Sequence, residues 1–317
     1  MKLRTLFALG LAALALAACG APNPPADSKT PARPRVALVL KTLNSPFFID
    51  MQKGATTAAG PLGLDLVVQA AEREVDVEKQ MQIVENLIQT GIKALLITPS
   101  GSREIVAVLA KAKAAGIPIV VVDTRLDPAA ASAAGVTVQS FVGSDNYEGG
   151  RVAGAELVAI TGGKAKVALL EGIPGHETGD SRLKGFRDAT KDSPGIKVVA
   201  SQTANWERDQ GFTVFQNMLQ SHPEIDSVFA CNDMMALGAI EAIAAAGKAG
   251  KIKVIGFDAV EDARKAIANG TMVASVAQSP SEMGRLAVES AARLIKGEAV
   301  PAEQTVKIEL VKGGEVK

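Results

Sequence analysis

Short apolar runs recur along the chain, each followed by a polar loop and then by a segment with helical periodicity. Val36–Leu40 contains only apolar residues, without alternation, as expected of a strand buried on both faces of a parallel sheet. It stops at the polar loop Lys41–Ser45, and Pro46 suits the first turn of the helix that follows. This repeat of strand, loop and helix is typical of βαβ units in a parallel sheet.

The pattern predicts strands at Val36–Leu40, Leu64–Val68, Ala94–Ile97, Ile117–Val122, Phe141–Gly143, Lys166–Leu170, Lys197–Ala200, Ser227–Ala230, Lys253–Phe257 and Met272–Ala277, and a final one near Thr305–Leu310. It predicts helices at Phe47–Leu62, Val75–Thr90, Glu104–Ala115, Asn146–Thr161, Ser181–Lys191, Arg208–Ser221, Met234–Ala246, Glu261–Asn269 and Met283–Ile295. Residues 126–140 lack a helical face and are expected to be an irregular connection at the edge of the first lobe. This number of strands is too large for one ordinary sheet, which favours an α/β fold with two lobes. The order of the elements implies that the chain crosses between the lobes more than once.

The chain begins with a targeting segment. Residues 1–19 have a basic start, an apolar stretch too short to span a bilayer, and small residues before Cys19, which together indicate a signal peptide. The last four of these residues resemble a bacterial lipobox, so we expect Cys19 to be lipidated and to become the mature N-terminus. Residues 20–35 are proline-rich and predict a semi-extended tether. We therefore expect a protein anchored to a cell-envelope membrane and facing the periplasm or the exterior, with the choice of inner or outer membrane open.

Composition and missing motifs restrict the function classes. The 34 basic and 34 acidic residues are spread along the chain, without the basic block expected of a nucleic-acid-binding protein. The sequence has no dinucleotide fingerprint, phosphate loop or nucleophile elbow, and no cysteine or second histidine stands at metal-ligand spacing from His176, so we expect neither a cofactor nor a metal. Apart from Cys19 the only cysteine is Cys231, which precludes an intramolecular disulfide in the mature protein and is expected to be a small buried hydrophobe.

Polar and aromatic side chains follow the predicted strands. Ligands of open α/β sheets bind beyond the carboxyl ends of the strands, so these residues are expected to form a site. Carboxylates, carboxamides and arginine bond hydroxyl groups, whereas aromatic rings stack on the apolar faces of a sugar ring. The residues are Lys41, Ser45, Phe47, Phe48, Asp123, Arg182, Trp206, Asn232, Asp258 and Gln278. They fit a pyranose, a furanose or a polyol.

Other interpretations of single residues stay open at this point. Asp123 and Asp258 are also typical of turns, and Trp206 could belong to a core. Asp233 directly precedes an apolar helical segment, so we expect it to cap that helix. The site hypothesis therefore depends on the joint placement of these residues.

The stretches KTLNSPFF, VVVDTR, VGSDN, RLKGF, ACNDMMALGA, VIGFDA and VAQSP closely resemble the ribose-binding-protein family. These are type I periplasmic binding proteins, the sugar receptors of ABC importers, and the resemblance runs from Val36 onward. It implies two Rossmann-like parallel-sheet lobes joined by a three-segment hinge: an N-terminal lobe of residues 36–144 plus 279–307, and a C-terminal lobe of residues 145–278 plus 308–317. It also implies a monomer that closes on a monosaccharide and delivers it to a membrane permease. By the resemblance, Phe47, Phe48 and Trp206 would stack on the sugar, and its hydroxyls would bond to Asp123, Arg182, Asn232, Asp258 and Gln278.

The sequence departs from this pattern around the expected cleft. Ribose binders carry a small serine where this chain has Lys41, and an asparagine where it has Ser45. The resemblance predicts an arginine directly after Asp123, but this chain has Thr124 there and an arginine, Arg125, at the next position. Both residues therefore stay candidates for sugar binding. A lysine could meet a carboxylate or a differently placed hydroxyl, which keeps uronates, hexoses, pentoses and polyols open as ligands.

The loop Gly175–Asp180 is a further departure, and it is expected to bring His176 and Glu177 near the cleft. An alternative function is therefore an extracytoplasmic sugar-modifying enzyme that uses His176 with Glu177 or Asp180 as acid and base. Another is a receptor subunit that serves a chemosensor or a sensor kinase in place of a permease.

Overall fold

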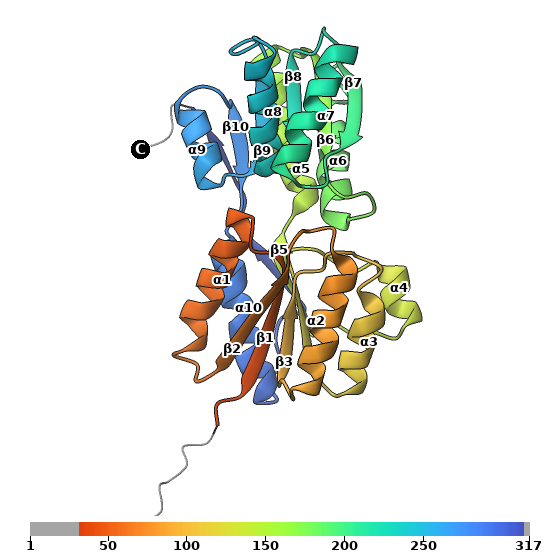
Figure 1. Ribbon diagram of the computed structural model, residues 1–317, viewed down its shortest axis with the longest axis vertical. Coiled ribbons are helices and arrows are strands. Elements are labelled where there is room, and N and C mark those ends of the chain that lie inside the picture. The colour runs from red at the N-terminus through yellow and green to blue at the C-terminus, as the bar shows by residue number, and fades with distance from the viewer. Residues whose placement is uncertain (1–31, 314–317) are drawn as a thin grey trace, which may run out of the picture. The chain divides into compact units, whose positions relative to one another are not determined.

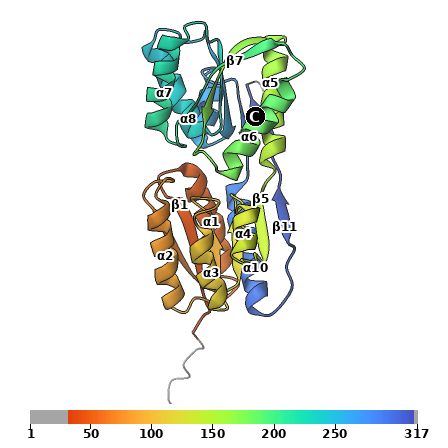
Figure 2. The ribbon, with the colours of Figure 1, turned by 90° about the vertical axis from the view of Figure 1, so that its right-hand side faces the viewer.

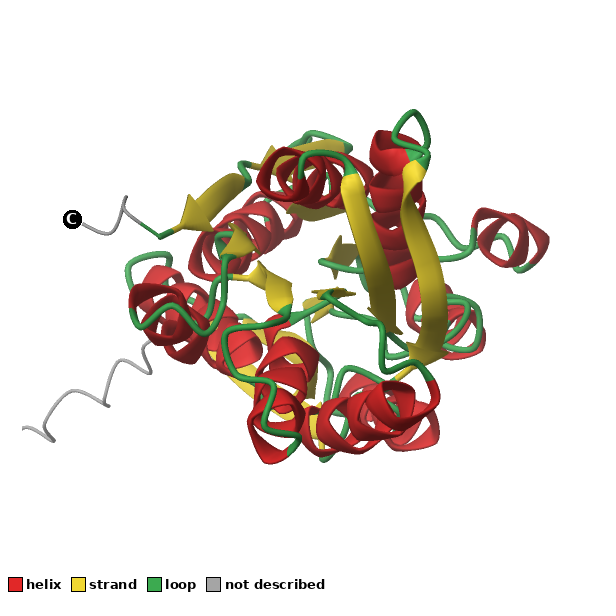
Figure 3. Ribbon diagram, turned by 90° about the horizontal axis from the view of Figure 1, so that it is seen from above, coloured by secondary structure: helices red, strands yellow, loops and turns green. Residues whose placement is uncertain are grey.

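A computed structural model of the protein describes residues 32–313. Within this range the chain forms two six-stranded sheets and ten helices, which confirms the prediction of a two-lobed α/β fold (Figure 1). Figure 3 shows the same elements from above, with helices around the strands. The predicted signal peptide, Cys19 and most of the proline-rich tether lie outside the described residues. No helix within the described range is both long and apolar enough to cross a membrane.

The first sheet carries the N-terminal strands. Its order is β11 (Glu303–Val306), β5 (Ser140–Ser144), β4 (Ile119–Val122), β3 (Ala94–Ile97), β1 (Arg35–Thr42) and β2 (Asp65–Ala71), and all neighbouring strands are parallel. Its covering helices are α1 (Pro46–Ala59), α2 (Val77–Gln89), α3 (Val106–Ala114) and α10 (Pro280–Ile295), with α1 and α10 on one side and α2 and α3 on the other (Figure 1). The central strands are fully buried, as continuous apolar runs predict. This sheet and its helices are the first lobe.

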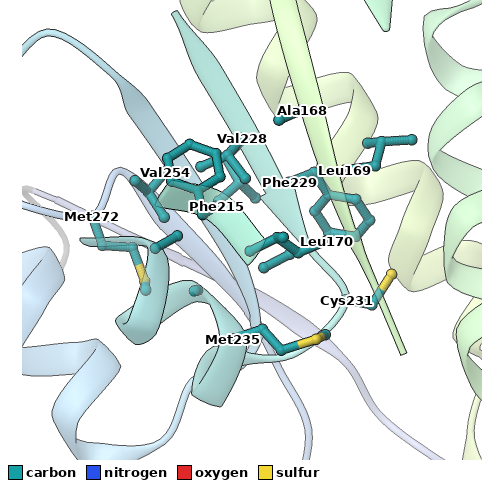
Figure 4. Close-up of a cluster of buried hydrophobic side chains, with 14 of the residues drawn as sticks. Ala168, Leu169, Leu170, Phe215, Val228, Phe229, Cys231, Met235, Val254 and Met272 are labelled. Atoms are coloured by element: carbon teal, nitrogen blue, oxygen red, sulfur yellow. The ribbon is translucent and has the colours of Figure 1, made fainter. Parts of the chain in front are cut away.

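The second sheet repeats this arrangement. Its order is β12 (Glu309–Lys312), β10 (Ala274–Ala277), β9 (Lys253–Asp258), β8 (Ser227–Ala230), β6 (Lys164–Glu171) and β7 (Gly195–Thr203). Its helices are α5 (Asn146–Thr161), α6 (Glu177–Thr190), α7 (Arg208–Ser221), α8 (Asp233–Ala245) and α9 (Glu261–Ala268). Figure 2 shows α5 and α6 on one side of this sheet and α7 and α8 on the other. Figure 4 shows part of its core, including Phe215 and Phe229. This sheet and its helices are the second lobe.

The chain passes between the two sheets three times. The passages lie between β5 and α5, between β10 and α10, and between β11 and β12. The exact lobe boundaries at residues 144/145, 278/279 and 307/308 stay predictions. Three passages between the lobes are what the resemblance to type I binding proteins implied.

Two local predictions are wrong. Residues 126–140 contain a short helix, α4 (Pro128–Ala133), whose start is capped by the Asp127 carboxylate accepting a hydrogen bond from the Ala130 amide. None of its residues is buried, so it has no amphipathic pattern to detect. The single strand predicted near Thr305–Leu310 is two strands, β11 and β12, in different sheets, and β12 pairs antiparallel with β10.

A close helix crossing fixes the position of α1. A Cβ atom on Gly54 of α1 would lie 1.9 Å from the Ser281 carbonyl oxygen, and one on Gly284 of α10 would lie 2.1 Å from the Met51 carbonyl oxygen. Only glycine therefore allows the two backbones to touch. This contact holds α1 at the end of β1, where its first turn presents two phenylalanines to the site described next.

Candidate functional site

Loops at the carboxyl ends of both sheets surround a narrow cavity. The predicted candidates that line it are Lys41, Ser45, Phe47, Phe48, Asp123, Arg182, Trp206, Asn232, Asp258 and Gln278, and the structure adds Glu74 and Thr178. Joint placement, on which the site hypothesis depends, is therefore observed.

Aromatic rings reach the cavity from both lobes. Phe47 and Phe48 in the first turn of α1 pack edge to face with ring centroids 5.2 Å apart. Trp206 lies in the turn between β7 and α7, and a Cβ on Gly172 would lie only 1.9 Å from its ring. All three aromatic residues are buried and also belong to the hydrophobic cores, so they serve the core and line the cavity at once.

Backbone strain concentrates at this cavity. Asp123, Trp206 and Asp258 have positive φ values of 67°, 69° and 111°, which lie in a backbone region that residues other than glycine rarely adopt. Such conformations persist only where surrounding contacts enforce them: here the Asp123 amide donates to Val142 O at 2.8 Å, and Asn232 Nδ2 donates to Trp206 O at 3.1 Å. Strained residues of this kind cluster at ligand sites, because strain fixes side-chain direction.

One wall of the cavity is a charged cluster of Lys41, Glu74 and Asp123. Lys41 Nζ lies 3.5 Å from Glu74 Oε2 and 3.4 Å from Asp123 Oδ2, and all three side chains are buried. Burial raises the pKa of Glu74 to about 7, because lost hydration outweighs the attraction of Lys41. Sequence reasoning missed Glu74, although it follows β2 as the other candidates follow their strands.

The opposite wall centres on Arg182 of α6. Its Nε donates to Asn146 Oδ1 at 2.9 Å and its Nη1 to Cys231 O at 2.6 Å, while Nη1 lies 3.7 Å from Asp258 Oδ1. Its guanidinium also stacks on the Phe257 ring at 3.7 Å. Burial raises the pKa of the Asp258 carboxyl against the attraction of Arg182.

Carboxamides complete this wall. Gln278 Nε2 donates to Asp258 Oδ1 at 2.8 Å, and Gln278 Oε1 is buried without a partner among the described residues. Asn232 caps α8, because its Oδ1 accepts from the Met235 amide at 2.9 Å. The prediction that Asp233 is the cap is therefore wrong: its carboxylate instead accepts from the Val260 amide and the Ser275 hydroxyl.

Two predicted sugar-binding residues do not line the cavity. Thr124 lies behind the wall, where its Oγ1 donates to Asp123 Oδ2 and lies 3.0 Å from Thr178 Oγ1. Arg125 points elsewhere, because both of its terminal nitrogens bond to Glu303, at 2.8 and 2.7 Å, and its guanidinium stacks on Phe141. Both terminal nitrogens of the Arg125 guanidinium already donate to the Glu303 carboxylate, so they do not point toward a ligand in the cavity.

His176 and Glu177 lie at the start of α6, where a loop was predicted, and neither lines the cavity. His176 Nε2 contacts Ser100 O of the first lobe, and the Glu177 amide donates to Ser102 Oγ at 3.4 Å. Burial, with the charge of Lys41, lowers the pKa of His176 to about 3. Cys231 is buried, as predicted, and burial raises its thiol pKa to about 12, so it is a poor nucleophile.

Together the fold and the cavity define a two-lobed α/β protein whose halves both contribute polar and aromatic side chains to one cavity. A family model described as a periplasmic binding protein domain matches residues 36–299, and the chain belongs to this family. The family is one of non-enzymatic periplasmic sugar-binding proteins of ABC transporters, which confirms the predicted ribose-binding-like membership and the absence of an enzymatic role.

Relatives of known identity match nearly the whole chain. The ribose import binding protein of Bacillus subtilis is 38% identical over 304 residues, which cover 95% of each protein. The D-ribose/D-allose-binding protein of Pseudomonas aeruginosa is 35% identical and covers 94% of each. A crystal structure of an ABC transporter solute-binding protein from Actinobacillus succinogenes with bound D-allose has a TM-score of 0.82 and 39% identity, and it matches 88% of this chain and 98% of that one.

Proposed function

We propose that the protein captures a monosaccharide or polyol in the cavity between its lobes and delivers it to an ABC importer. The observation that carries this proposal is the convergence, around one cavity, of aromatic rings and hydroxyl-bonding side chains from both lobes. Aromatic faces suit the C–H faces of a sugar, and carboxylates, amides and arginine suit its hydroxyls. The named import and sugar-binding functions of the relatives support the delivery step over a sensor role.

Capture is expected to work by closure of the lobes. Thr124 and Ser100 of the first lobe contact Thr178 and His176 of the second. A ligand that bonds both walls of the cavity stabilises this closed arrangement relative to an open one. The size of this stabilisation is set by the difference between the ligand's affinities for the closed and the open form. The permease would then recognise the closed form.

Lipid anchoring belongs to the same proposal. A diacylated Cys19 with the proline-rich tether of residues 20–35 would hold the receptor near the membrane while the lobes stay free to move. This placement would keep captured ligand close to a membrane permease.

A thermal-shift screen of the mature protein against aldoses, ketoses, polyols and sugar acids tests the capture step. A ligand that binds only the folded state must raise the melting temperature, by the equivalent of about 2.7 kcal/mol at 100 times its Kd. Trp206→Ala should weaken binding of the best ligand about 10- to 100-fold, because stacking area is lost. Arg125→Ala, outside the cavity, is the matched control and should bind normally. If no compound in the screen raises the melting temperature, the proposed function is wrong.

A further inference from the structure

We propose that the two lobes form a second binding site, separate from the sugar cavity, for an alkyl guanidinium or alkyl ammonium compound. The site is a pocket where the lobes meet, here called the seam pocket. The first lobe contributes Val75, Ser100 and Glu104 to it, and the second lobe contributes Ile173, His176 and Asp180. None of the described residues that line the seam pocket lines the sugar cavity, so the two sites are distinct.

Two side chains that line the seam pocket have a buried polar atom without a hydrogen-bond partner among the described residues. These atoms are Oγ of the fully buried Ser100 and Nδ1 of His176, whose ring is 2% exposed. Because His176 Nε2 contacts the Ser100 carbonyl oxygen, Nε2 carries the proton and Nδ1 keeps a lone pair that can accept a hydrogen bond. A buried acceptor without a partner costs free energy, so the pocket favours an occupant that donates hydrogen bonds.

The charge of the seam pocket favours a cationic donor over a neutral one. Glu104 and Asp180 both line the pocket, and neither carboxylate makes a hydrogen bond or an ion pair within the described part of the chain. Arg103, the cation of the lining, is already paired with Asp127 at 3.3 Å. Burial and the negative charge of Glu171 raise the pKa of Asp180, so the surroundings of this carboxyl are acidic. An N–H donor that carries a positive charge therefore fits this pocket best.

Lys41 is a cation that opposes such an occupant, because its positive charge acts on His176. The Lys41 ammonium lies on the side of the sugar cavity, where it is paired with the Asp123 carboxylate at 3.4 Å. This pairing reduces the repulsion that a second cation would experience at the seam pocket.

An apolar edge of the seam pocket suits an alkyl stem. The side chain of Val75 is 38% exposed, and Ile173 and Pro174 lie in the lining contributed by the second lobe. Methylene groups packed on these residues would be removed from water while their charged end reaches the carboxylates. A bare metal ion has no such stem, and the described residues contain no group of three or more side chains that could hold a metal. An organic cation is therefore the occupant that the lining favours.

Occupation of the seam pocket should favour closure of the lobes. Ser100 and Glu104 belong to the first lobe, whereas His176 and Asp180 belong to the second, so an occupant that contacts both stabilises the closed form. This step rests on the proposed function, because the sugar is expected to favour the same closed form. Linkage is reciprocal, so the sugar and the cation must strengthen each other's binding by the same factor.

The experiment is calorimetric titration of agmatine and of putrescine into the mature protein, with and without a saturating concentration of the best ligand from the thermal-shift screen. With the sugar present, agmatine should bind with a Kd below about 1 mM. Omission of the sugar should weaken this binding about 5-fold or more. Tetramethylammonium carries the same type of charge without an N–H group, so it is the control compound and should bind about 10-fold more weakly than agmatine.

Two variants test the location of the cation, one in each lobe. Glu104→Gln and Asp180→Asn should each weaken agmatine binding about 3-fold, because an exposed ion pair is lost. The sugar affinity measured without agmatine should stay the same in both, since neither side chain lines the sugar cavity. Glu78→Gln removes an exposed carboxylate in the neighbouring groove and is the matched control, in which agmatine should bind as in the wild type.

The outcomes distinguish the seam pocket from the sugar receptor. Agmatine binding that is absent, or no tighter than that of tetramethylammonium, indicates an adventitious cation only and overturns the site. Unchanged binding in both Glu104→Gln and Asp180→Asn overturns its location. Binding that is weakened in these variants but indifferent to the sugar overturns the coupling to closure. Failure of every sugar to bind contradicts the proposed function, whereas the agmatine titration without sugar still decides whether the seam pocket binds a cation.

Discussion

His176 should make ligand affinity fall as the solution is acidified. The imidazole ring is only 2% exposed, its Nε2 contacts Ser100 O of the other lobe, and Lys41 adds an unfavourable positive charge. Burial lowers the pKa of His176 to about 3, whereas a histidine in water has a pKa of about 6.5. If the lobes separate, the ring returns to water and regains its ordinary pKa.

The direction and the size of this pH effect on ligand affinity follow from the linkage between protonation of His176 and closure of the lobes. Because the pKa is lower in the closed form, protons bind preferentially to the open form, so His176 favours closure fully above pH 6.5 and loses that contribution as the pH falls toward 3. Between pH 7.5 and pH 5.5 the open-form histidine changes from mostly neutral to mostly charged. This change costs closure about 1.4 kcal/mol, which corresponds to about 10-fold in affinity.

The assay is titration of the best ligand at pH 7.5 and pH 5.5 into the wild-type protein and into His176→Gln. Glutamine keeps an N–H group that can donate to Ser100 O but does not titrate. Glu74 and Asp258 also titrate, but they are present in both proteins, so the difference between the two pH responses isolates His176. The wild type should lose about 10-fold more affinity than the variant. Equal losses in the two proteins would refute the reasoning.

Three further changes test other parts of the structure. Asp258→Asn replaces the buried carboxyl that faces Arg182 and accepts from Gln278, so calorimetry should show sugar binding weakened by about 1–3 kcal/mol without loss of fold; unchanged affinity would show that the Asp258 carboxyl does not bond the ligand. Gly172→Ala places a methyl group 1.9 Å from the ring of Trp206, the only tryptophan, so the emission spectrum should change and affinity should fall, whereas an unaltered spectrum would contradict the packing. Cys19→Ala should abolish incorporation of labelled palmitate and release the protein from membranes, and labelling of the variant would exclude the proposed anchor.

The sequence predicted the lobes well because their central strands are buried on both faces. Val36–Leu40 lies within β1, and every predicted run up to Met272–Ala277 overlaps a strand of the structure. The sequence pattern could not distinguish β11 from β12 as two separate strands, because each is only four residues long with mixed burial and neither carries a long apolar run. Only their partners distinguish them, since β11 pairs with β5 and β12 with β10.

The cavity residues were predictable as a group, because the carboxyl ends of parallel strands gather at one edge. Adjacent residues were harder to assign. Whether Thr124 or Arg125 would face the ligand depends on the turn at Asp123, whose φ of 67° has no signal in the sequence. Thr178 was missed because it lies in the first turn of α6, where a loop was expected.

Three departures from the ribose-binding pattern, Lys41, Thr124 and His176, are linked to one another through Asp123 and the charge of Lys41. Thr124 is fully buried and gives its hydroxyl proton to Asp123, so Thr178 must donate to Thr124 across the lobes. Asp123 in turn faces Lys41, the charge that also acts on His176 at the rim. On the proposed function, a ligand hydroxyl placed between Lys41 and its carboxylates would change the charge that Lys41 presents to His176, a residue in contact with the other lobe, and would thereby link ligand binding to closure.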